Sequence, residues 1–356
     1  MLRRWIFVTV LCASMLCCGC SEQIAESSAT DETSAANEET KTTRDLFAMD
    51  TYMRLTAYGE NGEAGITAAE NCIQDLDARL STGNASSEIA QLNANGTGTL
   101  SEDTCAILQE ALTLQRETDG AFNPLMYPIM QAWGFPTQEY RIPDASELQE
   151  LLLLTDPENM QFSPETGTVS FSVSGMELDL GGIAKGYTSD AVMDCFRSSG
   201  VTSGMVSLGG NVQTIGTKPD GSLWRVAIQH PDKEKDFLGV LETKDCAVIT
   251  SGGYERYFEE NGVRYHHIMD PATGRPADSD LLSVTIVSPN GILADGLSTA
   301  LFVMGLDQAT AYWQSHAESF DAVFYTTDET LYVTAGIQDC FSANYPCEII
   351  QEETKP

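Results

Sequence analysis

The segment YHHIMDPATGRPA, residues 265–277, holds two of the chain's four histidines. His266 and His267 are adjacent at the end of a predicted strand, so their side chains point to opposite faces and only one can face a site. The turn predicted at Asp270-Pro271 and Thr273-Gly274 would hold that histidine in place. A structural histidine or a general base fits this pattern. A Cys–His nucleophile lacks a clear cysteine partner, and adjacent strand residues cannot easily chelate one zinc ion.

A second segment, LDLGGIAKGYTSDAV at residues 178–192, reads as a strand end, a glycine turn and a helix with Lys185 in its first turn. Free N–H groups at the helix start and the lysine charge suit a phosphate. A plain strand–turn–helix corner fits as well, and the spacing is neither a P-loop nor GxGxxG. The segment GMVSLGGNVQTIG repeats the strand-then-glycine pattern, and we interpret its Asn211 as structural unless other segments converge on it.

A third segment, ILADGLSTALFVMG at residues 292–305, is an apolar helix that carries Asp295 and Thr299 four residues apart. Their oxygens share one helix face. A carboxylate with a hydroxyl suits Mg²⁺, which takes few protein ligands and keeps water or substrate phosphate in its other positions. The alternative is an aspartate in the first helical turn that serves only the helix dipole.

The elements that position these segments follow from hydrophobic periodicity and turn signals. Glu260-Asn261-Gly262 is a strong hairpin signal, and Asp144 and Glu147 have capping-box spacing. Short strands alternate with helices between hairpins, which predicts an α+β fold with mainly antiparallel sheets. Helices are expected at residues 66–80, 101–118, after Pro143, at 185–199, 293–304 and 307–317.

The charge balance restricts the partners. The chain has 19 basic and 52 acidic residues, a net charge of −33, which disfavours nucleic acid and anionic membrane surfaces. A phosphate-bearing substrate would therefore need a cation or a local pocket of donors.

The N-terminus predicts export. Residues 1–19 combine Arg3 and Arg4 with a short apolar run that ends before Cys20, similar to a bacterial lipoprotein signal whose cysteine carries the lipid. An ordinary secretory signal is the alternative. Residues 20–45 then form a lipidated cysteine and a disordered Ser/Thr/Glu-rich tether. One folded domain is expected over residues 46–350. The signal predicts that the mature protein lies outside the cytoplasm, lipid-anchored to the cell membrane.

Six cysteines lie beyond the signal, and none has the CxxC or CxxH spacing of a zinc site. Cys340 and Cys347 are close enough in sequence to form a bridge. The others lie in apolar runs, where a buried free thiol is common.

Taken together, the segments resemble the ApbE-like FAD:protein FMN transferases. The likeness runs from Met49 to about Gly305, over blocks in the family's order: AMDTYMRLTAYG, SEIAQLN, DGAFNPLMYPIMQAWGF, LDLGGIAKGY, SLGGNVQTIG, TSGGYERYFEENGVRYHHIMDPATGRPA and SVTIVSPNGILADGLSTALFVMG. The resemblance implies a T-fold-like α+β domain. It also implies Mg²⁺-dependent transfer of FMN from FAD to a Ser or Thr hydroxyl of an exported or membrane protein, such as a flavin-carrying electron-transfer subunit, with AMP released.

The resemblance also implies roles for individual residues of this chain. His267 and Asp295 are the candidate catalytic bases, and the choice between them stays open. Asp295 and Thr299 match metal ligands, with Ala184 contributing a backbone oxygen. The residues matching FAD contacts are Met49, Ala121, Phe122, Asn123, Asp179, Lys185 and His267.

Two positions depart from the family pattern. Asp50 replaces the glycine of the usual M-G-T block, and Gly83 stands where many members carry a flavin-stacking tyrosine. Weaker stacking leaves open an FAD pyrophosphatase that gives FMN and AMP. A flavin-binding lipoprotein without chemistry is a further alternative, which Asp295 and Thr299 argue against because it would need no metal pair. An adhesion or structural lipoprotein would explain the signal and the acidity but not the ordered blocks.

Overall fold

The computed structural model describes residues 40–352. The predicted signal segment, Cys20 and most of the predicted tether lie outside these residues. Strand β1 begins at Lys41, so the tether predicted to run to residue 45 is too long and the domain start predicted at residue 46 is too late. The reason is backbone pairing: β1 bonds to β2 along its whole length, which orders it although few of its side chains are buried.

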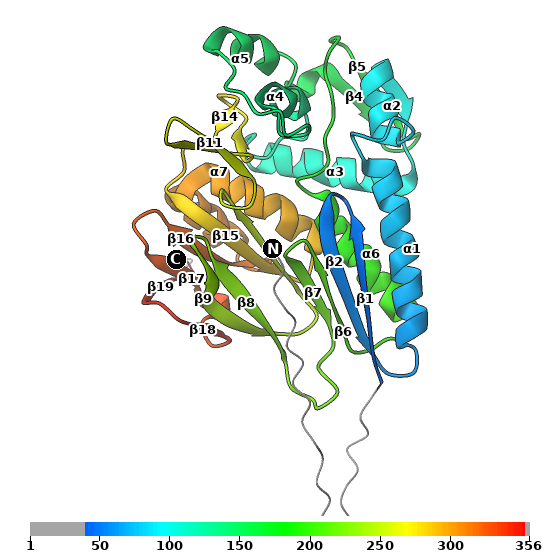
Figure 1. The fold of residues 1–356 in the computed structure, drawn as a ribbon, viewed down its shortest axis with the longest axis vertical. Coiled ribbons are helices and arrows are strands. Elements are labelled where there is room, and N and C mark those ends of the chain that lie inside the picture. Colours follow the sequence, from blue (N-terminus) through cyan, green and yellow to red (C-terminus); the bar gives the residue numbers. More distant parts are fainter. Residues whose placement is uncertain (1–39, 353–356) are drawn as a thin grey trace, which may run out of the picture. The chain divides into compact units, whose positions relative to one another are not determined.

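The centre of the fold is a nine-stranded sheet, in which all neighbours are antiparallel except β17 and β19 (Figure 1). This confirms the predicted α+β class with mainly antiparallel pairing. In sheet order the strands are β1 (Lys41–Ala48), β2 (Thr51–Tyr58), β6 (Gly204–Leu208), β7 (Asn211–Ile215), β10 (Ala247–Gly252), β15 (Leu281–Ser288), β16 (Asp321–Thr326), β17 (Leu331–Thr334) and β19 (Cys347–Ile350).

Four smaller sheets complete the β structure. They are β3 (Thr97–Thr99) with β5 (Thr168–Phe171) and β4 (Met160–Ser163); β18 (Phe341–Ala343) with β9 (Lys233–Thr243) and β8 (Trp224–His230); β11 (Tyr257–Glu260) with β12 (Val263–His266); and β13 (Met269–Asp270) with β14 (Arg275–Pro276). The predicted hairpin is confirmed at β11–β12. Asn261 and Gly262 form its two-residue turn with φ of 53° and 79°, the left-handed values that a type I′ turn requires.

The helices are α1 (Gly62–Leu80), α2 (Glu88–Asn95), α3 (Glu102–Glu117), α4 (Tyr127–Trp133), α5 (Ala145–Leu152), α6 (Ala184–Ser198) and α7 (Gly291–His316), with 3₁₀ turns η1 (Pro157–Asn159) and η2 (Ala335–Ile337). The predicted cap of α5 is confirmed, because Asp144 accepts a hydrogen bond from the Glu147 N–H. The two helices predicted at residues 293–304 and 307–317 are confirmed as the two parts of α7, which are separated by the non-helical backbone of Gly305 (φ 76°, ψ 171°). Helices α2 and α4 escaped prediction because they span only 8 and 7 residues, too few for a clear apolar period.

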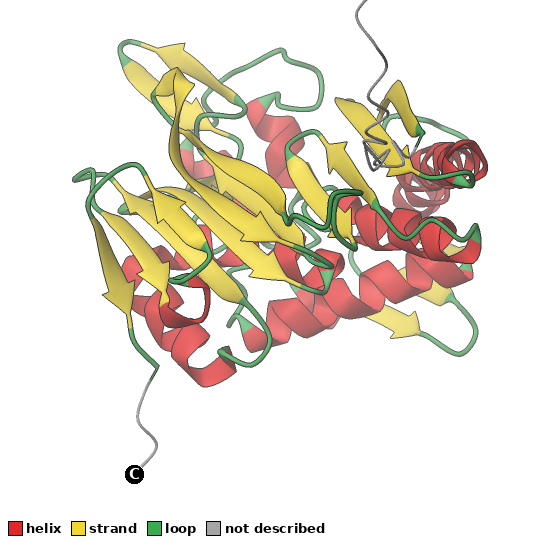
Figure 2. Cartoon of the chain, turned by 90° about the horizontal axis from the view of Figure 1, so that it is seen from below, coloured by secondary structure: helices red, strands yellow, loops and turns green. Residues whose placement is uncertain are grey.

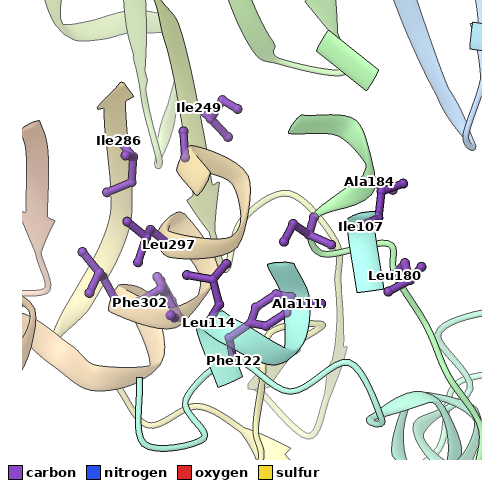
Figure 3. Packing of buried hydrophobic residues seen from close by; sticks show 14 of the residues in the cluster. Ile107, Ala111, Leu114, Phe122, Leu180, Ala184, Ile249, Ile286, Leu297 and Phe302 are labelled. Atoms are coloured by element: carbon purple, nitrogen blue, oxygen red, sulfur yellow. The ribbon is translucent and has the colours of Figure 1, made fainter. Parts of the chain in front are cut away.

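The main sheet separates two cores. Alternate residues of its strands point to opposite faces: Phe324 joins the core beneath α3, α6 and α7, whereas Tyr325 joins the core under β8 and β9. Figure 2 shows helices gathered on one side of the strands. Figure 3 shows the helix-side core, where Ile249 and Ile286 meet Leu297 and Phe302 of α7. The sheet is therefore buried on both faces over its central strands.

All six cysteines within residues 40–352 are free thiols in the structure, Cys340 and Cys347 included. Cys340 lies just after η2, where its thiol donates to the Ile337 carbonyl at 3.4 Å, while Cys347 is exposed at the start of β19. Over the described range, no helix has the length and apolarity needed to cross a membrane.

Candidate functional site

Asp295 is held at the point where α7 crosses the start of α6. Its Oδ2 accepts a hydrogen bond from the Gly186 N–H at 2.8 Å, and its Oδ1 accepts one from Asn211 Nδ2 at 2.9 Å. The residue is only 4% exposed and lies one turn deeper in α7 than the predicted first-turn position. Three elements thus fix one buried carboxylate, and Asn211, which we interpreted as structural, is one of its holders.

Glycines make this close crossing possible. A Cβ at Gly186 would lie 2.2 Å from the Gly291 carbonyl oxygen and 2.6 Å from the Asp295 Cβ. Asp190 of α6 secures the same junction by accepting from the N–H groups of Gly291 and Ile292, both at 2.9 Å. An anionic side chain at a helix start is stabilised by the free N–H groups there. The segment LGGIAKGYTSD therefore forms a turn and also, through Gly186 and Asp190, allows α7 to cross α6 closely.

The oxygens predicted to hold a metal come from this crossing. Thr299 lies one turn after Asp295, and its Oγ1 is 3.4 Å from Ser251 Oγ. The Ala184 carbonyl, at the start of α6, accepts from the Thr188 hydroxyl at 2.7 Å. The donor set is made only of oxygens, as Mg²⁺ prefers. Because no three His, Cys, Asp or Glu side chains of residues 40–352 converge, most other ligands of such an ion would come from water or substrate.

Charged groups from two separate segments meet beside this crossing. Burial raises the pKa of Asp179, while the Gly181 N–H and the charges of Arg256 and Lys185 act to lower it. Burial also raises the pKa of Glu255 to about 7; Lys185 opposes the rise and Asp295 adds to it. Glu255 keeps contact with solvent, so water moderates this effect. Lys185 and Arg256 thus place two positive charges where the acidic protein otherwise offers few.

His267 faces these cations, whereas His266 does not. The His267 N–H donates to the Arg256 carbonyl at 3.0 Å, and its ring Nδ1 lies 3.2 Å from the same oxygen. Since a carbonyl only accepts, Nδ1 carries the proton and Nε2 keeps a free lone pair. Burial, with the charge of Arg256, lowers the pKa of His267 to about 3. The His266 ring instead packs edge-to-face on Phe302 of α7, 5.5 Å between centroids.

A turn and a group of aromatic rings support the segment that carries His267. Thr273 Oγ1 donates to Asp270 Oδ2 at 2.9 Å and the Gly274 N–H donates to the Asp270 carbonyl at 2.8 Å, which confirms the predicted turn. Trp133 Nε1 donates to the Gly274 carbonyl at 2.8 Å. Ring contacts continue from Tyr140 to Phe258, to Tyr265 and Trp133, and from Phe135 to His267.

The predicted N-terminal flavin contact lies in the tight turn between β1 and β2. Met49 and Asp50 have φ of 49° and 57°, so Asp50 adopts the left-handed backbone that the family's glycine would take easily. The Met49 N–H donates to Asp77 of α1 at 3.0 Å, and its sulfur lies 3.6 Å from the Thr188 hydroxyl oxygen of α6. The turn is thereby fixed one helical turn from Lys185.

The loop between α3 and α4 holds three of the seven residues predicted to meet FAD. Ala121 and Asn123 line a cavity of 510 Å³ together with Asp270 of the histidine segment. Asn123 is already engaged, donating to the Thr155 carbonyl and accepting from the Leu125 N–H, both at 2.9 Å. The Phe122 ring is 4% exposed and packs in the core (Figure 3), which leaves only its backbone for a ligand.

The structure thus brings Lys185, Asp179, His267 and Asp295 into one charged neighbourhood. Sequence reasoning missed Glu255 and Arg256, although YER directly follows the SGG turn. The available signal was the position of Glu255 and Arg256, two adjacent charged residues between the Gly252-Gly253 turn and the next strand.

Residues 49–324 match the model of the ApbE family. Two similar relatives carry the name FAD:protein FMN transferase. One, from Treponema pallidum, is 34% identical over 81% of this chain and 85% of the relative; the other, from Klebsiella pneumoniae, is 35% identical over 74% and 82%. Among solved structures, the ApbE protein of Thermotoga maritima superposes with a TM-score of 0.79 at 30% identity, covering 85% of this chain and 99% of that one. The flavin transferase ApbE of Vibrio cholerae gives 0.77 at 28%, with the same coverage.

Proposed function

The chain belongs to the ApbE family, and from that premise we propose that it transfers the FMN half of FAD to a Ser or Thr hydroxyl of an exported or membrane protein, with Mg²⁺ bound and AMP released. The observation that carries the proposal is the meeting of the oxygens of the α6–α7 crossing, the cation Lys185 and a neutral His267. Transfer of a phosphoryl group needs charge neutralisation and a base at one place.

Asp295, Thr299 and the Ala184 carbonyl would hold the ion. When bound, Mg²⁺ would neutralise pyrophosphate charge and stabilise charge that develops during transfer. Lys185, next to Ala184 in α6, and Arg256 would bind the phosphate oxygens beside the ion, since both lie close enough to lower the pKa of Asp179. In an acidic chain these groups make the site locally attractive to an anion.

We favour His267 as the base because its Nε2 is free. Its lowered pKa keeps the ring neutral at pH 7 but also makes Nε2 a weak base, so geometry and not basicity favours this residue. Both oxygens of Asp295 are already hydrogen-bonded, and a carboxylate that holds a cation is a weaker base. In the proposed step Nε2 takes the hydroxyl proton, the hydroxyl oxygen forms a bond to the FMN phosphorus, and the pyrophosphate P–O bond breaks with AMP as leaving group.

Hydrolysis of FAD is the second candidate, and Gly83 favours it. Gly83 is exposed, and a Cβ there would meet only Ser81 Oγ at 3.9 Å. A side chain could therefore start here, but the chain lacks the ring that stacks on the flavin in many family members. With weaker stacking, water could reach the phosphorus in place of the acceptor hydroxyl. A binding-only protein is less favoured because it would not need the buried Asp295.

We also propose that Cys20 carries a lipid that anchors the protein to the outer side of the cell membrane. The support is the basic and apolar character of residues 1–19 ahead of Gly19-Cys20. Labelling with a fatty-acid analogue, compared between the wild type and Cys20→Ser, tests this proposal; equal labelling of both would refute it.

To test the activity, the chain from residue 21 onward would be mixed with FAD, Mg²⁺ and a flavin-carrier domain that offers a Thr acceptor. A matched acceptor with that Thr replaced by Val is the control. Intact mass of the acceptor and the nucleotide products are read together. Transfer is supported if the mass of the Thr acceptor rises by one esterified FMN, AMP is released, and the mass of the Val control does not change. Free FMN and AMP in both reactions supports hydrolysis, and bound but unconsumed FAD supports the binding-only alternative.

A further inference from the structure

Helices α1 and α6 pack against each other in antiparallel orientation. At one end, a Cβ on Gly65 of α1 would lie 2.6 Å from Val201 Cγ2, just after α6, and 3.6 Å from Ser199 Cβ. At the other end, Asp77 of α1 accepts from the Met49 N–H and Thr188 of α6 contacts the Met49 sulfur at 3.6 Å. These contacts set the register of the two helices.

That register places Cys72 opposite Cys195. Cys72 follows Gly65 by seven residues, and Cys195 follows Thr188 by seven residues, so each lies about two turns in from an end of the paired region. Burial, together with the nearby Cys195 thiol, raises the pKa of Cys72 to about 12, which agrees with this register. Both side chains are half-buried free thiols, so a small reagent can reach them.

We propose that Cys72 and Cys195 are a disulfide site, closed by thiol–disulfide exchange with a small-molecule or protein disulfide. One thiolate attacks a sulfur of the donor disulfide, forming a mixed disulfide and releasing one donor thiol. The second protein thiol then displaces the second donor thiol. Two cysteine protons leave, two donor thiols form, and one S–S bond joins α1 to α6. The predicted export signal places the chain where such donors persist.

The raised thiol pKa values set the rate of this reaction. Burial raises the pKa of Cys195 as well as that of Cys72, so little thiolate is present at neutral pH and exchange is slow. The pair therefore suits a long-lived structural bond more than a rapid redox sensor. The bond would close a long loop, since the two residues are 195 − 72 = 123 positions apart, and long loops gain the most from closure.

A bond at this place would act on the site indirectly. Helix α1 holds the Met49 turn through Asp77, and α6 begins at Ala184 and Lys185. Joining the two helices would fix the flavin-side turn relative to the phosphate-side helix. The inference does not depend on the reaction that the site catalyses.

The test uses the chain from residue 21 onward, with Cys20 absent, reduced and then incubated with excess oxidised glutathione at alkaline pH. The protein is denatured in acid, alkylated with N-ethylmaleimide and measured by intact mass and peptide mapping. We expect two fewer alkylated cysteines, a loss of two hydrogens and a cross-linked peptide pair containing Cys72 and Cys195. The melting temperature should rise by roughly 5 °C or more.

Cys72→Ser and Cys347→Ser are matched single-thiol controls. Cys347 is exposed and distant in sequence from the pair, so Cys347→Ser should still form the bridge, and Cys72→Ser should not. Full alkylation of the wild type after oxidation, stable glutathione adducts in place of the bridge, or a bridge between other cysteines would overturn the proposal. So would a bridged protein whose melting temperature equals that of the reduced form.

Discussion

The α6–α7 crossing and the β11–β14 hairpins, which carry the residues of the proposed site, are built by different means. The crossing joins a 15-residue and a 26-residue helix over facing glycines, with the carboxylate of Asp295 buried and doubly bonded. The hairpins are two-stranded sheets supported by rings and one turn. Regions with fewer buried contacts open at lower free energy. The side that bears the ion would therefore be rigid, and the side that bears the base more adjustable.

Among the variants that test this difference between the two regions, Asp295→Ala in the crossing should have the largest effect on activity. Metal-dependent turnover should fall by about a thousandfold or more, which corresponds to about 4 kcal/mol of lost transition-state stabilisation. The change also leaves the Gly186 N–H and the Asn211 amide without a partner, at a cost of about 1–3 kcal/mol in the free energy of unfolding. Turnover at increasing Mg²⁺ and denaturant unfolding measure the two losses.

That stability cost exceeds the value of about 1 kcal/mol for an exposed carboxylate at a helix start, which the sequence suggests. Asp190→Asn is the control, because Asp190 secures the same junction without belonging to the proposed ligand set. It should lower stability and keep Mg²⁺-dependent turnover. Full activity of Asp295→Ala would show that the ion binds elsewhere.

On the hairpin side, His267→Gln should lower acceptor labelling by about a hundredfold, the usual contribution of a general base. Binding of FAD and Mg²⁺ should stay within about twofold, because the ring carries no charge at pH 7. Single-turnover labelling and FAD titration measure the two quantities. If the variant instead loses FAD binding and labels normally at saturation, His267 is a binding residue and not the base.

Packing at the crossing can be tested apart from chemistry with Gly186→Ala. The new Cβ would meet the Gly291 oxygen at 2.2 Å, so the helices must separate, and the free energy of unfolding should fall by about 3 kcal/mol. Gly83→Ala is the matched control, since no atom lies within 3.9 Å of a Cβ there, and it should change stability by less than about 0.5 kcal/mol. Equal stability of the two variants would contradict the rigid crossing.

The pH dependence of stability reports on the hairpin side. The pKa of His267 is about 3 in the folded chain against 6.5 as the ordinary value, so the unfolded chain takes up the proton first. Its contribution to stability is complete above pH 6.5 and is lost as the pH falls toward 3. Between pH 6.5 and 5 the loss is about 2 kcal/mol. His267→Gln should flatten this part of the metal-free stability profile, while an unchanged slope would mean that the ring is not buried beside Arg256.

The smallest expected effect belongs to Tyr140→Ala. Tyr140 stacks on Phe258 at 4.9 Å, and the loss should be about 1 kcal/mol in the free energy of unfolding. Acceptor labelling should slow modestly without a change in Mg²⁺ affinity. Tyr52→Ala is a control at another exposed aromatic position and should leave labelling unchanged. An altered Mg²⁺ affinity in Tyr140→Ala would show that the two sides of the site are not independent.

Sequence reasoning reached the fold class because apolar periods and turn residues act locally. The Asn261-Gly262 hairpin and the Asp144 cap are decided within four residues. The short helix α4 and strand β1 were missed because partners far along the chain stabilise them: Trp133 of α4 bonds to Gly274, and β1 is ordered by β2.

For the site, sequence patterns gave residue types but not their partners. The i, i+4 spacing placed Asp295 and Thr299 on one helix face, yet nothing in the spacing indicates that Asn211 holds the carboxylate. Glu255 and Arg256 appear as ordinary surface charges in sequence, and only the fold brings them to Lys185. Residue-level ligand roles remain predictions for mutagenesis to decide.

Strand β1 also determines how the domain would carry a mechanical load. The chain enters at Lys41, and the eight-residue strand places this point about 27 Å from the Met49 turn, at the other end of the hairpin (Figure 1). Hydrogen bonds to β2 run across the strand, so a pull from a membrane anchor would load them together in shear. Tension would reach the main sheet before it reached the flavin-side turn. If Cys20 carries the proposed lipid, tension from the anchor would act first on this edge strand and not on the turn where FAD is expected to bind.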